Sequence, residues 1–354
     1  MLQLQGTGLI VLLGATALVS AALVRLSITY AHRRALIDQP GRRRSHRVPT
    51  PRGGGVAIVA SALGAMLLLP AASLPAQHLQ VTAAIVLVTT VGWADDHRGL
   101  HAAWRFAAHC VAALLVVLAW LPASAVPGLP WLPAAGTVAL ATLGVAWSIN
   151  LHNFMDGIDG LLAWQAIFVF VLLALLGWHA GELAQARVLA LWAAATAGFL
   201  PFNFPHARVF MGDVGSAALG LVIAAGLLWL ARQPGILAIG LVACSAFVVD
   251  ASCTLLSRLV RGRRWYSAHR EHLYQWLVRR GLSHARVVLL YMGWNLLVVV
   301  PVIVILQRVD PIAQRAAGIT CVIAVYAAGI ALWWAGKRAC LRRLRQERSA
   351  CCAS

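Results

Sequence analysis

Long uncharged runs of apolar residues recur from one end of this chain to the other, and they leave few folds open to it. Eleven runs of about 15 to 20 residues alternate with short polar segments. Their length approaches the roughly 20 residues that a helix needs to cross the hydrocarbon core of a bilayer. A mean hydropathy of +0.79, with only 11% charged residues, excludes a soluble domain. We therefore expect an all-α polytopic membrane protein with about 11 transmembrane helices in a single domain, residues 1–354.

The basic residues are distributed in a way that orients these runs. Segments after the odd-numbered runs contain 24 of the 29 basic residues, including a basic tail at about 337–354. Basic loops remain in the cytoplasm, so the N-terminus is expected outside and the polar blocks inside. The net charge of +18 is then explained by the orientation of the spans and by contact with anionic lipid, not by nucleic-acid binding. The runs are Gly8–Val24, Gly55–Ala72, Leu79–Ala94, Phe106–Leu121, Trp131–Ile149, Leu161–Trp178, Val188–Phe204, Ser216–Leu230, Ile236–Leu256, Val287–Leu306 and Ala316–Gly336.

Acidic residues are scarce in the chain and are concentrated in or beside the predicted cytoplasmic segments. A carboxylate near a membrane is costly, so its concentration there favours a functional explanation over a solubilising one. Because all these segments lie on one predicted side, they are expected to form one shared site. Eight of the eleven acids belong to this set: Asp38, Asp95, Asp96, Asp156, Asp159, Asp213, Asp250 and Glu271.

The first two polar blocks carry opposite charges. The segment from Asp38 to Gly55 combines several arginines with a glycine run, and Arg52 directly precedes the glycines. Guanidinium groups and open backbone N–H groups suit phosphate, although a basic turn before the second run is an equal alternative. The adjacent Asp95 and Asp96 repel each other, which a divalent cation or a shared proton would relieve. The alternative for this pair is a helix end with two solvated acids.

The third and fourth blocks add carboxylates and amides. Asn150, Asn153, Asp156 and Asp159 recur every three residues, which keeps them near one face if the segment is helical. Four such groups exceed what a plain turn requires and suit a polar ligand. In the fourth block, which begins at Asn203, Asp213 is flanked by glycines. It is either an exposed ligand for a hard cation or an N-terminal cap of the following helix.

The fifth block begins inside the ninth run at Asp250 and continues through several arginines to His269, Arg270 and His272. Two histidines at i and i+3 beside an arginine form a cationic patch suited to phosphate. Too few further ligands accompany them to favour zinc. Asp250 lies well inside a run, and we expect it either to contact the site or to pair with a basic residue one or two turns later.

Taken together, the blocks indicate a Mg²⁺-assisted phosphoryl-transfer site on the cytoplasmic face. Magnesium typically uses few carboxylates and completes its shell with phosphate oxygens and water. Arginines and the metal together stabilise the charge that develops on a transferring phosphoryl group. A soluble phosphorylated donor and an acceptor held in the membrane would be the substrates.

Five motifs, in order between residues 38 and about 286, resemble those of the bacterial polyprenyl-phosphate N-acetylhexosamine-1-phosphate transferases, glycosyltransferase family 4. They are Thr50-Pro-Arg-Gly-Gly-Gly55, Gly92-x-x-Asp95-Asp96, Asn150-x-x-Asn153-x-x-Asp156-Gly-x-Asp159-Gly-Leu161, Phe210-x-Gly-Asp213-x-Gly-Ser216 and His269-Arg-x-His272. The resemblance implies transfer of a sugar-1-phosphate from a UDP-sugar to undecaprenyl phosphate, with release of UMP. It also implies a multi-pass protein of the bacterial cytoplasmic (inner) membrane, and a homodimer is left open.

The resemblance also implies roles for individual residues, with Mg²⁺, or Mn²⁺ in its place, as cofactor. Asp95 and Asp96 would be catalytic at the lipid-phosphate end. Asp213 and Asp96 would hold the metal. The substrates would be bound by Arg52, Asn150, Asn153, Asp156, Asp159, Asn203, His269, Arg270 and His272.

One departure bears on the donor. The branch that makes the peptidoglycan lipid precursor carries three consecutive histidines in its last cytoplasmic loop, whereas this chain reads His269-Arg-Glu-His272-Leu-Tyr-Gln275. This argues against UDP-MurNAc-pentapeptide as donor and favours the branch that initiates O-antigen or other surface polysaccharides. Its donors are UDP-N-acetylhexosamines, including 6-deoxy sugars.

Three rival classes fit the sequence less well. Transporters and flippases place coupling groups near the midplane of broken spans, whereas here nearly all acids lie at run ends on one side. The CDP-alcohol phosphotransferases would continue after Asp156 with an Ala-Arg and further spaced acids, which are absent. A non-catalytic scaffold would have no need of the whole acidic set.

Overall fold

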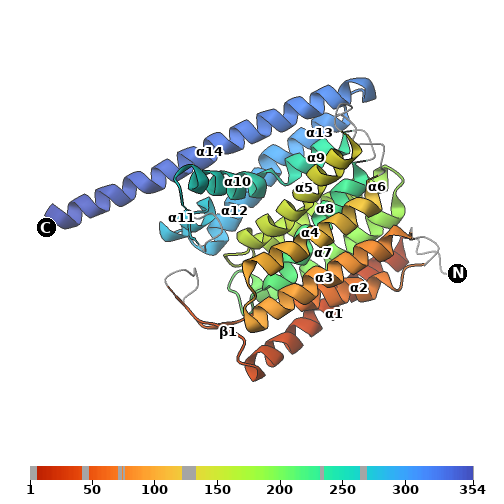
Figure 1. Ribbon diagram of the computed structural model, residues 1–354, viewed down its shortest axis with the longest axis horizontal. Coiled ribbons are helices and arrows are strands. Elements are labelled where there is room, and N and C mark those ends of the chain that lie inside the picture. The colour runs from red at the N-terminus through yellow and green to blue at the C-terminus, as the bar shows by residue number, and fades with distance from the viewer. Residues whose placement is uncertain are drawn as a thin grey trace.

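The computed structural model describes residues 6–41, 48–70, 74, 76–121, 133–231, 235–263 and 269–353. Long helices run side by side in one bundle, and the β1–β2 ribbon and α11 lie at the same end of it (Figure 1). The elements are α1 (Thr7–Arg33), β1 (Ile37–Asp38), β2 (Thr50–Pro51), α2 (Gly55–Met66), α3 (Gln77–Arg98), α4 (Ala102–Trp120), α5 (Ala134–Met155), α6 (Leu161–His179), α7 (Leu183–Asn203), α8 (Asp213–Leu230), α9 (Ile236–Ala243), α10 (Ser245–Val260), α11 (Leu273–Arg279), α12 (His284–Trp294), the π-helix η2 (Asn295–Val299), α13 (Val300–Gln307) and α14 (Pro311–Ala353).

Each of the eleven apolar runs coincides with a helix or with consecutive helices, which confirms the all-α polytopic class. Among the described residues, seven helical segments are long and apolar enough to cross a membrane, and an eighth if the bent pair α9–α10 counts as one span. The second run is helical over only 12 residues, in α2. Residues 131 and 132 of the fifth run, and 71 and 72 of the second, lie outside the described residues. Eleven crossings and their orientation therefore stay a prediction.

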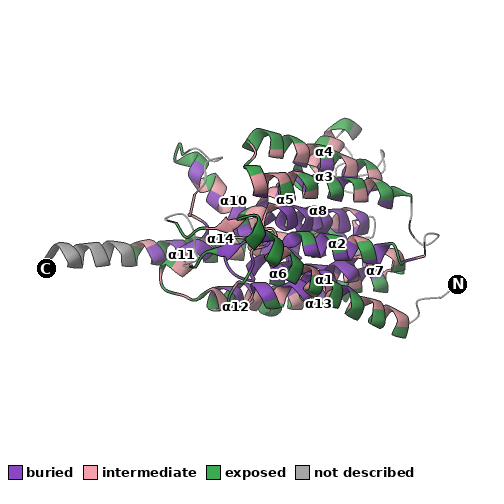
Figure 2. Cartoon of the chain, turned by 90° about the horizontal axis from the view of Figure 1, so that it is seen from below, coloured by how far each residue is buried: buried purple, intermediate pink, exposed green. Residues whose placement is uncertain are grey.

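Helix α8 forms the centre of the bundle. Of its residues 83% are buried, against 17% in the corresponding window of α1, and Figure 2 shows this contrast between the middle and the periphery. It packs against α2, α3, α4, α5 and α6. Alanine and glycine fill much of α8, as in helices that neighbours approach closely within a membrane. The N-terminus of this central helix consequently lies where several polar blocks can converge.

The predicted ninth span is broken. Helices α9 and α10 meet at an angle of 64° around Cys244. A break frees backbone carbonyls, which must find other partners where no water is available. The Gln165 side chain from α6 donates to the carbonyl of Ala243 at 3.1 Å and accepts from the Asn295 amide at 2.7 Å. This buried polar pair joins α6, α9 and the π-helical turn η2.

Two further features were not predicted. An antiparallel ribbon pairs Ile37 with Pro51 and Asp38 with Thr50, and it brings Arg52 to the bundle. Arg42, Arg43, Arg44, Ser45 and His46 of the first basic block lie outside the described residues. The last run and the predicted basic tail form one continuous helix, α14, which projects beyond the bundle at its C-terminal end (Figure 1).

Candidate active site

Two carboxylates from different helices converge on one guanidinium group. Nη1 of Arg105, near the start of α4, lies 2.7 Å from Oδ2 of Asp95 and 2.8 Å from Oδ2 of Asp213. The side chains of Arg105, Asp95 and Asp213 are 33%, 14% and 29% exposed. The end of α3 and the start of α8 thus present carboxylate oxygens to the same point, as the sequence predicted for two of the acidic blocks.

Asp96 faces the N-terminus of α8. Its two oxygens accept hydrogen bonds from the backbone N–H groups of Asp213 and Val214, both at 3.3 Å, and only 4% of the residue is exposed. A helix N-terminus favours a negative charge, so these two hydrogen bonds partly offset the cost of burying the carboxyl group. The cap of α8 is therefore supplied by Asp96 from α3, and not by Asp213, the alternative that the sequence left open. Gly92 permits this approach, because a Cβ there would lie 2.6 Å from the backbone of Asp213.

The first and fourth blocks are joined through their backbones. The N–H groups of Gly54 and Gly55 donate to the carbonyls of Phe210 and Met211 at 2.9 and 2.8 Å. The glycine run therefore fixes one loop against the other, and these two N–H groups are not open to an anion as the pattern had suggested. The guanidinium of Arg52 donates to the backbone carbonyl of Asp96, which places it directly beside the carboxylates.

The third block is only partly helical, because α5 ends at Met155. Asn150 lies within hydrogen-bond distance of His109 on α4 (3.3 Å), and the Asn153 amide donates to Ser216 of α8 at 3.0 Å. Asp156 follows the helix. Burial, and then the negative charges of Asp213, Asp96 and Asp159, raise the pKa of Asp156 to about 8. The four groups therefore do not share one helix face, although Asn150, Asn153 and Asp156 all lie beside α4 or α8.

Asp159 and Asn203 use their polar atoms to hold loops together. An Asp159 oxygen accepts from the N–H of Ala207 at 3.2 Å and lies 3.1 Å from Nδ1 of His284. Asn203 accepts from the N–H of Gly160 at 2.9 Å and donates to the carbonyl of Val209 at 3.0 Å. Both residues are at most 9% exposed. This geometry suits positioning of the site, and substrate contact by these two residues stays a prediction.

The fifth block packs against the third. The hydroxyl of Tyr274 donates to the carbonyl of Phe154 at 2.9 Å, and the rings of His269 and His272 lie 5.0 Å apart. Burial, followed by the charge of His272, lowers the pKa of His269 to about 4, so this ring is neutral at pH 7. Arg270, between the two histidines, is partly buried like His269, whereas His272 is buried. Residues 264–268 of this block lie outside the described residues.

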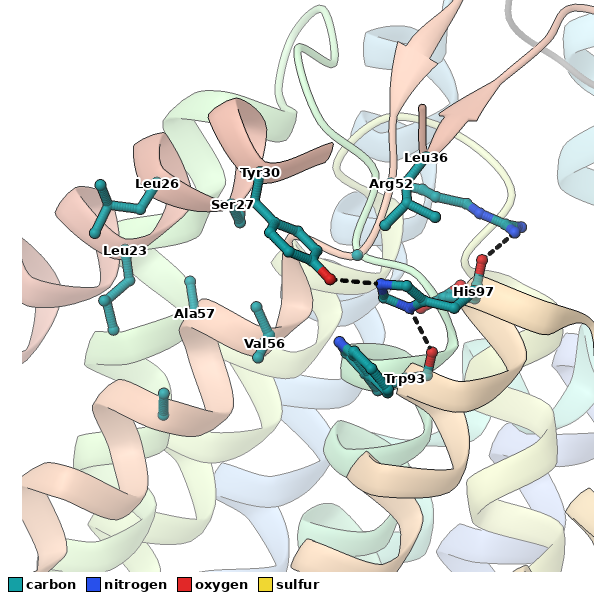
Figure 3. A pocket seen from close by; sticks show the side chains of 13 residues that line it. Leu23, Leu26, Ser27, Tyr30, Leu36, Arg52, Val56, Ala57, Trp93 and His97 are labelled. Carbon is teal, nitrogen blue, oxygen red and sulfur yellow. Dashed lines mark hydrogen bonds between the residues drawn. The ribbon is translucent and has the colours of Figure 1, made fainter. Parts of the chain in front are cut away.

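An apolar groove of about 310 Å³ runs between α1, α2 and α3 and ends at the acidic site (Figure 3). Leu23, Val56 and Trp93 line its apolar part, while Arg52 and Asp96 lie at its polar end. The hydroxyl of Tyr30 and Nε2 of His97 are 3.1 Å apart at that end. Leu26, also in the lining, is 65% exposed on the outer surface of the bundle. The groove thus connects the outside of the bundle with the carboxylates.

The described residues contain no group of three acidic, histidine or cysteine side chains arranged to hold a metal ion unaided. A magnesium site differs from such a cluster, since it needs one or two carboxylates together with substrate phosphates and water. The converging oxygens of Asp95 and Asp213 meet that requirement, with a cation already between them. Both oxygens of Asp96 point to the α8 N-terminus, so Asp95 is better placed beside Asp213 than the predicted ligand Asp96.

Sequence reasoning missed several residues that the geometry brings to this site. Arg105 lies ten residues beyond Asp95, at the start of an apolar run, where a single arginine resembles a membrane anchor. His109 and His284 were overlooked because each is an isolated histidine, the first inside the apolar helix α4 and the second at the start of α12. Tyr274 was noted only within a motif, and its contact with Phe154 depends on tertiary packing.

Comparison with known proteins identifies the same family that the five motifs resemble. Residues 78–231 match the model of "Glycosyl transferase family 4". Decaprenyl-phosphate N-acetylglucosaminephosphotransferase of Mycobacterium leprae is 33% identical over 303 residues, 75% of each chain. A probable undecaprenyl-phosphate N-acetylglucosaminyl 1-phosphate transferase of Bacillus subtilis is 26% identical, covering 72% of each chain. Phospho-N-acetylmuramoyl-pentapeptide-transferase of Staphylococcus aureus matches at 36% identity over only 32% of this chain and 35% of its own.

Proposed function

Because the chain belongs to glycosyl transferase family 4, among its polyprenyl-phosphate N-acetylhexosamine-1-phosphate transferases, we propose that it joins such a sugar phosphate to a lipid. The donor is a UDP-N-acetylhexosamine, the acceptor is undecaprenyl phosphate or a close homologue, and UMP is released. The observation that carries this proposal is the convergence of Asp95, Asp96 and Asp213 beside Arg52 and Arg105. These groups lie where a soluble donor and a membrane-held acceptor can meet.

For this phosphoryl transfer, the protein mainly has to position the two substrates and offset their negative charge. An oxygen of the lipid phosphate attacks the β-phosphorus of the donor, and the bond from that phosphorus to the bridging oxygen breaks. Lipid phosphate is largely ionised at pH 7, so Asp95 orients the acceptor and is not required as a strong base. Arg52 and Arg105 offset the charge of the phosphates. His269, Arg270 and His272, which pack against the third block, are proposed to bind the donor.

Magnesium fits the residues present. Asp95, Asp96, Asp156 and Asp213 bring four carboxyl groups to a site that holds Arg52 and Arg105. Burial, and then the charges of Asp213, Asp96 and Asp159, raise the pKa of Asp156 to about 8, so a bound cation would offset the cost of ionising these groups together. Asp213 and Asp95 would hold the ion, with Asp96 at the α8 N-terminus supporting Asp213. The bound ion would supply charge neutralisation on the donor diphosphate and the departing UMP.

The groove between α1, α2 and α3 is proposed to receive the first isoprene units of the acceptor. It is apolar along Leu23, Val56 and Trp93, and it ends at Arg52 and Asp96, where the phosphate belongs. Its open side, at Leu26, faces lipid. A lipid phosphate bound there would lie beside the converging carboxylates without leaving the membrane.

The donor is proposed to be UDP-linked N-acetylglucosamine or a related hexosamine, and the product to initiate O-antigen or another cell-surface polysaccharide. The names of the M. leprae and B. subtilis relatives support an N-acetylglucosamine phosphate. The partial S. aureus match keeps UDP-MurNAc-pentapeptide as a second donor to test, although the chain lacks the histidine run of that branch.

A reconstituted assay tests the proposal. Purified protein in vesicles is given polyprenyl phosphate, Mg²⁺ or Mn²⁺ and, in separate reactions, UDP-N-acetylglucosamine, a 6-deoxy hexosamine donor and UDP-MurNAc-pentapeptide. We expect UMP and a lipid-linked sugar diphosphate with one of the first two donors, and none after EDTA. Absence of lipid-linked product with every donor would refute the proposed activity.

A further inference from the structure

Arg105 lies at the point that a divalent cation between Asp95 and Asp213 would take. A single nitrogen, Nη1, is 2.7 and 2.8 Å from one oxygen of each carboxylate. The guanidinium is therefore not attached to one acid as an ordinary ion pair, because it bridges α3 and α8 through one atom. On the basis of the proposed function, we infer that Arg105 is a built-in competitor of the metal, which must displace it before the ion can bind.

Displacement follows from charge. Two cations held by the same two oxygens repel each other strongly, because the energy between charges rises as the distance between them falls. The Arg105 contact and the bound ion therefore exclude each other. Once displaced, the guanidinium remains tethered to α4 beside the site, where it is available to a substrate phosphate.

The surroundings allow this exchange. The Arg105 side chain is 33% exposed, so it can swing toward water without burying an unpaired charge. Asp95 keeps its orientation without Arg105, because its other oxygen accepts from the N–H of Leu100 at 2.5 Å. Asp213 is held at the start of α8, where its N–H donates to Asp96. The two carboxylates consequently stay in place for the incoming ion.

A purely structural ion pair makes the opposite prediction. If Arg105 only held α3, α4 and α8 together, its removal would disorder the carboxylates and weaken metal binding. If it competes with the metal, its removal leaves two uncompensated carboxylates and strengthens binding. The sign of the change in Mg²⁺ affinity thus separates the two roles.

The test uses full-length protein in detergent after EDTA treatment and dialysis, titrated with Mg²⁺ and followed by thermal shift and calorimetry without substrates. Arg105→Met keeps an unbranched apolar stem and removes the charged guanidinium, and we expect it to lower the apparent Kd for Mg²⁺ about tenfold. Arg98→Met removes an exposed arginine at the end of α3 and is expected to leave the Kd unchanged. An unchanged or higher Kd in Arg105→Met would overturn the inference.

A second variant covers failure of the first to fold. Arg105→Lys keeps the charge on a shorter chain without the guanidinium fork, so it competes less well, and its Kd should lie between those of the wild type and Arg105→Met. A Kd for Arg105→Lys equal to or above that of the wild type counts against the inference. The proposed function is judged separately from the competition. If the wild type shows no transfer activity while Arg105→Met binds Mg²⁺ more tightly than the wild type, only the proposed function is refuted. Normal transfer with unchanged Mg²⁺ affinity in Arg105→Met refutes only the competition.

Discussion

The carboxylate of Asp250 accepts a 2.7 Å hydrogen bond from the backbone N–H of Leu273, the first residue of α11. The same buried side chain also accepts from the hydroxyl of Tyr291 at 2.6 Å and from the indole of Trp333 at 3.0 Å. With the Thr254 hydroxyl of α10, which donates at 3.2 Å, its hydrogen-bond donors are neutral groups on α10, α11, α12 and α14, and not the basic residue that spacing along the helix had offered. Asp250 holds the N-terminus of α11, and with it His272, in position.

We therefore predict that Asp250→Ala acts on donor binding at a distance. Loss of hydrogen bonds to a buried charged group costs about 1.5–3 kcal/mol each, so the melting temperature should fall. In the surviving folded protein, KM for the UDP-sugar should rise at least fivefold while KM for the lipid changes little. Steady-state kinetics with each substrate varied in turn measures this. Asp310→Ala, beyond the opposite end of the bundle, is the control, and equal effects on both KM values would contradict the assignment.

Because Tyr274 contacts Gly157, we predict that substitutions at these two positions have non-additive effects on activity. A Cβ at Gly157 would lie 2.0 Å from the Tyr274 hydroxyl, so Gly157→Ala must push α11 away from the third block and reduce activity. Tyr274→Phe removes the clashing oxygen as well as its hydrogen bond to Phe154. We expect Gly157→Ala to be less harmful in the Tyr274→Phe background than alone. Additive losses in the two single variants and the double variant would argue against this contact.

The raised pKa of Asp156 predicts how stability depends on pH. Because its pKa is about 8 in the folded protein and near 3.8 when unfolded, the folded state binds the extra proton between these values. Stability of metal-free protein should consequently fall as pH rises from about 5 to 8, and Asp156→Asn should flatten this trend. Thermal shift in EDTA across this range measures it. A melting temperature that rises toward pH 8 equally in both proteins would contradict the assignment.

Filling the groove should affect the lipid substrate alone. Ala60 lines the groove, and Ala60→Trp is expected to raise KM for polyprenyl phosphate by tenfold or more with little change in KM for the donor. Leu118→Trp introduces the same bulk at a lipid-exposed position of α4 outside the groove lining and should leave both values near wild type. Similar kinetics for the two variants would remove the groove from the acceptor site.

The helices and the convergence of Asp95, Asp96 and Asp213 were accessible from sequence, because apolar length and charge asymmetry are local patterns. Each acid lies at the boundary of a run, so placing the runs also placed the acids at one end of a bundle. The periodicity of the third block misled in one respect, since the helix ends at Met155 and leaves Asp156 and Asp159 in the following turn.

Other features depend on partners that are distant in the chain. Arg105 bridges Asp95 and Asp213, which are 10 and 108 positions away from it in the sequence. The partners Asp250 and Trp333 are separated by 83 positions. The break at Cys244 lies in an uninterrupted apolar run, and the Gln165 side chain that satisfies the freed carbonyl comes from another helix. Such relationships arise from packing, and no spacing rule within one segment encodes them.

The most direct measurement of the central claim compares wild type with Asp213→Asn in the vesicle assay, using saturating UDP-N-acetylglucosamine or whichever donor the panel identifies, polyprenyl phosphate and Mg²⁺. Removing this carboxylate deprives the ion of a ligand at the start of α8, so UMP release should fall at least about a hundredfold while the purified protein keeps its size-exclusion profile. Asp95→Asn should behave alike. Turnover by Asp213→Asn within a few-fold of wild type would contradict the claim that the acids at the ends of α3 and α8 form the reaction centre.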